Sequence, residues 1–182
     1  MPEQALAIYA SAIPTLLRAG QEQDAEIVLT NYVALAFLLG QEQAALTFAR
    51  RQKLSHRREQ LMVSSLEATL ENEVGATAAL QQYAQANPDV PPAVIDRRKD
   101  WNTALLALRR ADSDAAKRAL PNLRASSVSG WGQSLVFFVR GRLKLLVLDY
   151  RGAERDFRMA RAFVRFFRQW PQVSLVEHLS DF

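Results

Sequence analysis

A small-residue signal that recurs at a near-constant interval limits what this chain can fold into more than any other feature of its sequence. Each copy places an alanine near the start of an apolar segment, and successive copies lie 34, 37 and 37 residues apart, at Ala45, Ala79, Ala116 and Ala153. Intervals of this size are typical of helical hairpins that stack into an array. Such arrays present an open, grooved surface that commonly binds another chain.

The composition favours an all-α fold in a single domain, residues 1–182. Apolar residues make up 49% of the chain, which is typical of a folded protein, and the good helix formers Ala, Leu, Gln, Glu and Arg dominate. The chain has only 7 Gly and 7 Pro, and its β-branched residues do not alternate as they would in strands. The sequence therefore predicts an α-solenoid of about four antiparallel helical hairpins.

Glycines, prolines and capping residues divide the sequence into nine predicted helices. The first covers residues 3–19, ends at Gly20 and contains Pro14, which we expect to kink or interrupt it. The other eight helices pair into four hairpins with tight turns. The hairpins cover residues 22–54, 56–87, 92–124 and 130–170, and the tail at 171–182 could form one more short helix.

Each recurring alanine falls near the start of the second helix of a hairpin, where a small side chain allows close approach of the two helices. Asp112 is a predicted N-cap for a helix that runs to about Arg124, and Ser55 is a predicted N-cap for a helix that ends before Gly75. The first helix has no hairpin partner in this scheme. We interpret it as an N-terminal cap or as the second helix of a preceding repeat.

In its last hairpin the chain resembles the tetratricopeptide-repeat family. The match combines the family's small residue in the first helix with its alanine, aromatic and alanine in the second, at Gly141, Ala153, Phe157 and Ala160. A shorter match follows Ala79, at Tyr83 and Ala86. In that hairpin Glu67 stands where the family has glycine, and the resemblance to the family's first-helix signature is weak throughout.

The resemblance implies a right-handed superhelix in which the first helix of each hairpin lines a concave groove. Two of these helices carry the main groove candidates, which are Arg98, Trp101, Leu105, Leu108, Leu135, Phe138, Arg142 and Leu145. The corresponding positions of the hairpin at 56–87 are Leu61, Ser64, Ala68 and Glu71. Aromatic side chains there would bury apolar groups of a peptide while arginines pair with its carboxylates. The alternative is that the aromatics belong to the core and the arginines are solvated.

The last predicted helix carries a stripe of arginines at spacings of 4, 3, 3, 4 and 3 residues. Its members are Arg151, Arg155, Arg158, Arg161, Arg165 and Arg168. This spacing places them along one side of a helix. The stripe is either a solvated face or a surface for an acidic protein, an anionic membrane or nucleic acid.

The net charge of +4 is distributed unevenly. Residues 1–91 carry 6 basic and 10 acidic side chains, whereas residues 92–182 carry 17 basic and 9 acidic ones. This asymmetry favours an acidic partner, an anionic surface or head-to-tail self-association. The leading hypothesis is a protein-interaction module that binds a peptide or partner helix. The alternatives are an anionic-surface binder and a self-associating structural domain.

Chemistry-bearing motifs are scarce in the sequence, so we expect no enzyme, cofactor or metal site. The chain has no cysteine, and its two histidines, His56 and His178, lack metal-ligand spacing. The N-terminus lacks a signal-peptide pattern, and the longest apolar runs, at 32–39 and 135–139, are too short to span a bilayer. We expect a cytoplasmic protein. The 19 arginines against 4 lysines hint at a GC-rich bacterial gene.

Overall fold

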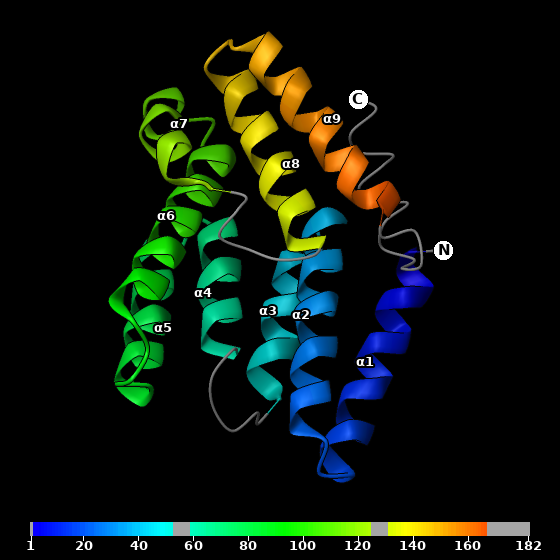
Figure 1. The fold of residues 1–182 in the computed structure, drawn as a ribbon. Coiled ribbons are helices and arrows are strands. Elements are labelled where there is room, and N and C mark those ends of the chain that lie inside the picture. Colours follow the sequence, from blue (N-terminus) through cyan, green and yellow to red (C-terminus); the bar gives the residue numbers. More distant parts are fainter. Residues whose placement is uncertain (1, 53–58, 125–130, 167–182) are drawn as a thin grey trace. The chain divides into compact units, whose positions relative to one another are not determined.

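The computed structural model describes residues 2–52, 59–124 and 131–166, and all regular structure in these ranges is helical (Figure 1). The all-α prediction is therefore confirmed for the described residues. The helices are α1 (Pro2–Arg18), α2 (Glu22–Leu38), α3 (Glu42–Arg51), α4 (Glu59–Thr69), α5 (Glu73–Ala86), α6 (Pro92–Arg109), α7 (Ser113–Ala119), α8 (Trp131–Leu146) and α9 (Tyr150–Phe166), with a 3₁₀ turn η1 (Leu120–Asn122). No helix in the described ranges is both long and apolar enough to cross a membrane.

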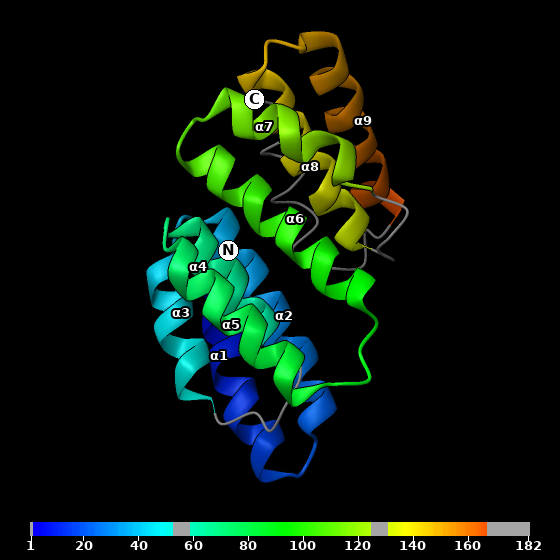
Figure 2. The same ribbon diagram turned by 90° about the vertical axis from the view of Figure 1, so that its left-hand side faces the viewer.

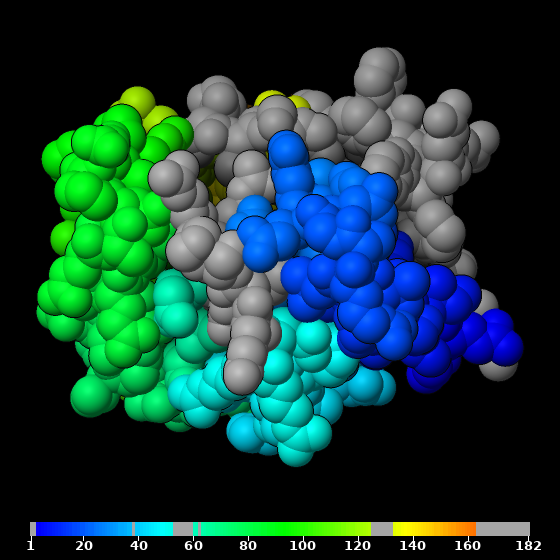
Figure 3. Space-filling model, turned by 90° about the horizontal axis from the view of Figure 1, so that it is seen from below, coloured from blue at the N-terminus to red at the C-terminus, as the bar shows by residue number. Residues whose placement is uncertain are grey.

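The chain forms two compact units, Met1–Arg98 (unit 1) and Lys99–Phe182 (unit 2), which meet inside α6. In unit 1 each helix packs against the next, from α1 to α5 (Figure 2). Figure 3 shows α1, α2 and α3 (dark blue to cyan) side by side on one face of this unit. The first predicted helix therefore has a neighbour in unit 1, because α1 packs along α2. Pro14 does not interrupt α1, in which Leu6 and Ile13 are buried.

Unit 2 contains the end of α6, then α7, η1 and the α8–α9 hairpin. The chain folds back along α6, since the Asn122 side-chain amide donates a 3.1 Å hydrogen bond to the Asp100 carboxylate. The helix capped by Asp112 ends at Ala119 and not near Arg124. Pro121, which has no N–H to donate and disfavours an α-helix, lies in η1. The predicted cap Ser55 and the tail at 171–182 lie outside the described residues.

The same turn ends five of the described helices. Its key residue has a left-handed backbone, with φ of 73°, 69°, 64°, 51° and 62° at Gly20, Gly40, Glu71, Ala111 and Leu148. In each case the next residue donates its N–H across the turn to the carbonyl five positions back, at 2.8 or 2.9 Å. This bond satisfies a carbonyl left unpaired at the helix end.

The residue after each left-handed position directly precedes the next helix, at its N-cap. The N-cap side chains of Asn72, Asp112 and Asp149 accept backbone N–H bonds from the first turn of that helix. The pKa of the Asp112 carboxyl group is lowered, and the largest cause is the hydrogen bond that it accepts from the Ala115 N–H. Because the folded-state pKa is lowered, this cap is fully stabilising above the unfolded carboxyl's pKa and is lost as the pH falls through the folded value.

The turns define the register of the recurring alanines more firmly than composition does. A buried alanine follows each left-handed residue by five positions, at Ala25, Ala45, Ala76, Ala116 and Ala153. In α5 the equivalent of Ala116 and Ala153 is therefore Ala76 and not Ala79. Both α5 alanines are buried because residues three apart share a helix face. The four alanines of the sequence signal are all buried, as close helix packing requires.

Turn substitutions test this geometry directly. Gly40→Ala is expected to lower the free energy of unfolding by about 1 kcal/mol, since an L-residue resists this backbone and an added Cβ meets no atom within 4 Å. Ala111→Gly is expected to raise it by up to about 1 kcal/mol for the same reason. Ala162→Gly, in the exposed interior of α9, should instead destabilise by about 1 kcal/mol. Urea unfolding measures all three, and equal signs for both Ala→Gly changes would contradict the strain argument.

Candidate partner-binding surfaces

The eight main groove candidates lie on α6 and α8, but they do not belong to one unit. Arg98 is in unit 1, and the other seven are in unit 2. Leu105 and Phe138 are buried, Trp101, Leu108 and Leu135 are half-buried, and only Arg142 and Leu145 are exposed. In α4, Leu61, Ser64 and Ala68 are buried, whereas Glu71 is exposed at its left-handed turn position. Of the eight main candidates, the exposed ones therefore lie at the C-terminal end of α8, whereas Trp101, Leu108 and Leu135 are accessible only in part.

Phe138 lies inside the α8–α9 hairpin. Its ring packs against that of Phe157, with centroids 6.0 Å apart and planes tilted by 54°. Phe157 also covers Gly141, where an added Cβ would come within 2.5 Å of the ring. On this face the Ser134 hydroxyl donates a 3.0 Å hydrogen bond to the Ala160 carbonyl. Phe138 thus serves as core in this structure and is covered as long as the hairpin stays closed.

Arg98 is held within unit 1. Its guanidinium donates a 3.0 Å hydrogen bond to the Ser65 hydroxyl of α4, and the Ser65 hydroxyl itself bonds to the Leu61 carbonyl. Desolvation by burial lowers the pKa of Arg98 to about 10, with Tyr83 acting in the opposite direction. The side chain therefore stays cationic at neutral pH and links α4 to the part of α6 that belongs to unit 1.

The arginine stripe of α9 divides into three parts. Arg151, Arg155 and Arg158 are exposed, and Arg161 is half-buried. The side chains of Arg165 and Arg168 lie outside the described part of the chain. Arg158 pairs with Glu154, one helical turn earlier, at 2.5 Å. The exposed face of α9 is accordingly basic over its first three turns.

The opposite side of α9 contains a buried carboxylate, Asp156, that the sequence interpretation did not single out. Its side chain is 6% exposed and forms ion pairs with two cations of α8, at 3.3 Å to Arg140 Nε and 2.9 Å to Lys144 Nζ. Lys144 also donates to the Gly152 carbonyl at 3.3 Å, and the Arg140 guanidinium lies 5.5 Å from the Phe137 ring centre. The sequence contains a signal that could have identified Asp156. It is a lone acidic residue opposite the basic stripe, and it follows the buried Ala153 by three positions.

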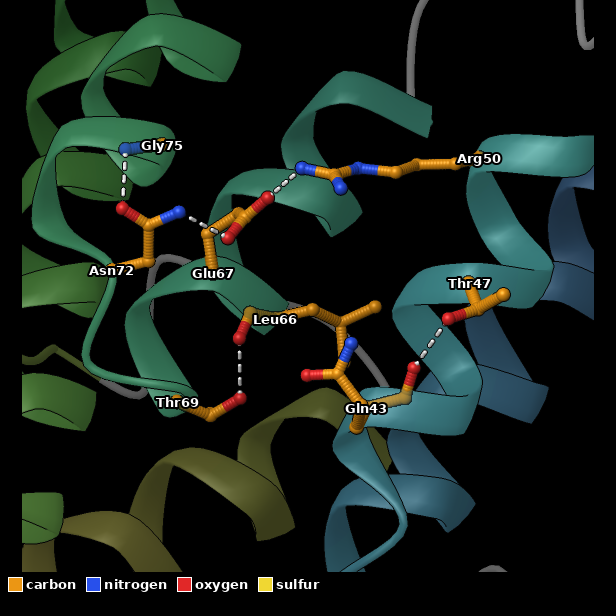
Figure 4. A network of polar contacts seen from close by, with 8 residues as sticks. All are labelled: Gln43, Thr47, Arg50, Leu66, Glu67, Thr69, Asn72 and Gly75. Carbon is orange, nitrogen blue, oxygen red and sulfur yellow. Dashed lines mark hydrogen bonds and ion pairs between the residues drawn. The ribbon is translucent and has the colours of Figure 1, made fainter.

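Unit 1 has its own buried carboxylate at Glu67, which joins three helices (Figure 4). The carboxylate of this α4 residue is 3% exposed, pairs with Arg50 of α3 and accepts a 2.7 Å hydrogen bond from the Asn72 amide. The Asn72 side-chain oxygen in turn accepts from the Gly75 N–H and caps α5. Figure 4 shows these groups converging from α3, α4 and the start of α5. The polar groups of this network therefore bind one another and position the helices from which they come.

Large apolar side chains remain exposed around the α8–α9 turn. Leu145 at the end of α8 is 42% exposed, Leu148 in the turn 69%, Tyr150 at the start of α9 64%, and Met159 further along α9 43%. Leu148 is also one of the left-handed residues, a conformation that normally favours glycine. Exposed apolar groups next to arginines make this end of unit 2 the strongest candidate surface in the described residues.

No protein-family model, curated protein or solved structure matches this chain.

Proposed function

We propose that this chain is a non-catalytic protein-interaction module, built as a tetratricopeptide-like array of helical hairpins, that binds a peptide or helix of acidic character. The observation that carries the proposal is the exposed surface of unit 2. It combines Arg142 and Leu145 on α8 with Leu148, Tyr150 and Met159 beyond it. Arginine, tyrosine and methionine are enriched in protein interfaces, and arginine and tyrosine supply much of the binding energy there.

The groove version of this proposal uses the first helices of the hairpins. Trp101 and Leu108 of α6 are half-buried and keep part of their surface accessible, and Arg142 is exposed for a partner carboxylate. A bound segment would bury apolar side chains on the indole while its acidic groups pair with the guanidinium. Leu105 and Phe138 would support this surface from the core.

The test is a nuclease-treated affinity pull-down from the source lysate with the wild type and a Trp101→Ala, Arg142→Glu variant. Loss of a central aromatic anchor costs about 2 kcal/mol, so the variant should lose at least about tenfold in retained partner. Circular dichroism must show that the variant keeps its helix content. A set of retained proteins that is identical for wild type and variant would refute the groove assignment.

Binding to an anionic surface is the second candidate function, and the exposed Arg151, Arg155 and Arg158 favour it. It predicts affinity that falls steeply with salt. Insertion of α9 into a membrane conflicts with its packing, because the Phe157 side of the helix faces α8. Self-association stays a prediction of the charge asymmetry.

A further inference from the structure

The outer face of α9 is an exposed surface among the described residues of unit 2. Its members are Tyr150, Arg151, Arg155, Arg158, Met159 and Ala162, all exposed. The reverse side is fixed to α8 through Asp156, Phe157 and Ala160. Because that side is anchored by ion pairs and close packing, the outer face is presented on a pre-organised helix. Pre-organisation lowers the entropy lost when a partner binds.

The spacing of the outer face suits a second helix. Arg155, Met159 and Ala162 follow one another at intervals of four and three residues, which places them in one seam along α9. The small Ala162 side chain permits a close approach of helix axes, and Met159 adapts its shape to a partner. The outer-face residues from Tyr150 to Ala162 offer about 18 Å of such a seam.

The charge of the outer face indicates the chemistry of its occupant. Among the described residues, the structure gives Arg151 and Arg155 no ion-pair partner, and the carboxylate next to Arg158 is Glu154 of the same helix. A partner with carboxylates beside its apolar seam would complement these guanidinium groups. The acidic residues would meet Arg151 and Arg155 while apolar residues cover Met159 and Ala162.

We propose that the outer face of α9 binds an acidic amphipathic helix of a partner protein. The inference rests on the proposed function in that the occupant is a protein. Its surface shares Tyr150 and Met159 with the exposed surface described above, but it does not include the groove residues Trp101, Leu108 and Arg142. A protein fits better than a nucleic acid because Met159 and Ala162 interrupt the row of arginines and Glu154 would repel phosphates. It fits better than a membrane because Phe157 and Ala160, on the apolar side of α9, already pack against α8.

The test titrates the full chain with a synthetic helical peptide of about 20 residues, in which glutamates flank a leucine stripe, and reads fluorescence anisotropy. A matched peptide with lysines in place of the glutamates should bind at least about tenfold more weakly. The R151E/R155E variant should weaken binding of the glutamate peptide by at least about tenfold. The control R109E/R118E makes the same change of charge at exposed sites of α6 and α7, and its affinity should stay within about twofold of wild type.

Met159→Ser removes an apolar contact without changing the charge, and about threefold to tenfold weaker binding is expected. Equal losses in R151E/R155E and R109E/R118E would overturn the inference, because net charge alone would then explain binding. So would equal affinity for the two peptides, or binding of duplex DNA or phosphatidylserine vesicles that depends on Arg151 and Arg155 while the peptide does not bind.

The outcomes also separate this inference from the proposed function. A partner that is lost from the Trp101→Ala, Arg142→Glu variant but binds R151E/R155E normally would leave the interaction module standing and remove the outer face from it. Glutamate-peptide binding that requires Arg155 and Met159, without any groove-dependent partner, would support the outer face and refute the groove.

Discussion

Replacing Asp156 with alanine is expected to lower the free energy of unfolding by about 3 kcal/mol or more. The carboxylate is buried between Arg140 and Lys144, whose side chains are themselves only 24% and 17% exposed. Without Asp156, two cations would remain close together at the hairpin interface with little water to screen them. Urea unfolding followed by circular dichroism measures the effect, which belongs to the transition of unit 2 if the units unfold separately.

Two further variants make the Asp156 prediction specific. Glu154→Ala removes an exposed carboxylate from the same helix and should change stability by at most about 0.5 kcal/mol, since the Glu154–Arg158 pair is solvated. Lys144→Met in the Asp156→Ala background should recover part of the loss, because it removes one of the stranded cations. A loss for Asp156→Ala as small as that for Glu154→Ala would show that the ion pairs contribute little net stability.

Helix content and most helix positions could be predicted because they depend on local properties. Helix formers, apolar spacing and the recurring alanines indicated nine helices, and the structure has α1 to α9 in the predicted order. The partial errors follow from what a short sequence window contains. Pro14 disfavours a helix locally, yet α1 continues through it, and Pro121 ends an α-helix that composition alone would extend.

Glycine alone does not identify every helix end in this chain. Gly20 and Gly40 mark helix ends correctly, and both adopt the left-handed backbone. Glycine also predicts a helix boundary at Gly75. In the structure Gly75 lies within the first turn of α5, where an added Cβ would come within 2.3 Å of the Asn72 amide. The actual turn residue is Glu71, and no propensity scale favours glutamate there. The local marker of this boundary is the N-cap Asn72, which directly follows Glu71.

The candidate surfaces could be predicted only in part. The spacing of Arg151, Arg155 and Arg158 predicts one helix face, and all three residues are exposed in the structure. The groove residues depended on a family register, and burial of Leu105 and Phe138 depends on neighbours distant in the sequence. Asp156 and Glu67 were missed as structural centres because a buried carboxylate is recognisable only when the cations from other helices are in view.

Glu67→Ala is the second substitution with a large expected effect, a loss of about 2 kcal/mol in the free energy of unfolding. The buried carboxylate accepts from Asn72 and pairs with Arg50, and its removal leaves the Asn72 amide without this acceptor. The expected loss is smaller than for Asp156, because the Arg50 side chain is 58% exposed and can turn to water. Urea unfolding and thermal unfolding should both show it.

Three companion variants distinguish a network from a simple cavity. Glu67→Gln keeps the shape and one acceptor, so it should cost about 1 kcal/mol, and Asn72→Ala should cost about 1 kcal/mol through loss of the α5 cap. If Glu67 orients Asn72, the double variant Glu67→Ala, Asn72→Ala loses less than the sum of the single changes. Glu67→Gly installs the residue that the tetratricopeptide resemblance expects, and it should be the most damaging of the set because glycine adds about 1 kcal/mol of helix cost. If Glu67→Gly instead leaves the free energy of unfolding unchanged, α4 and α5 can pack in the family's manner without the carboxylate. The polar network would then accompany that packing and not cause it.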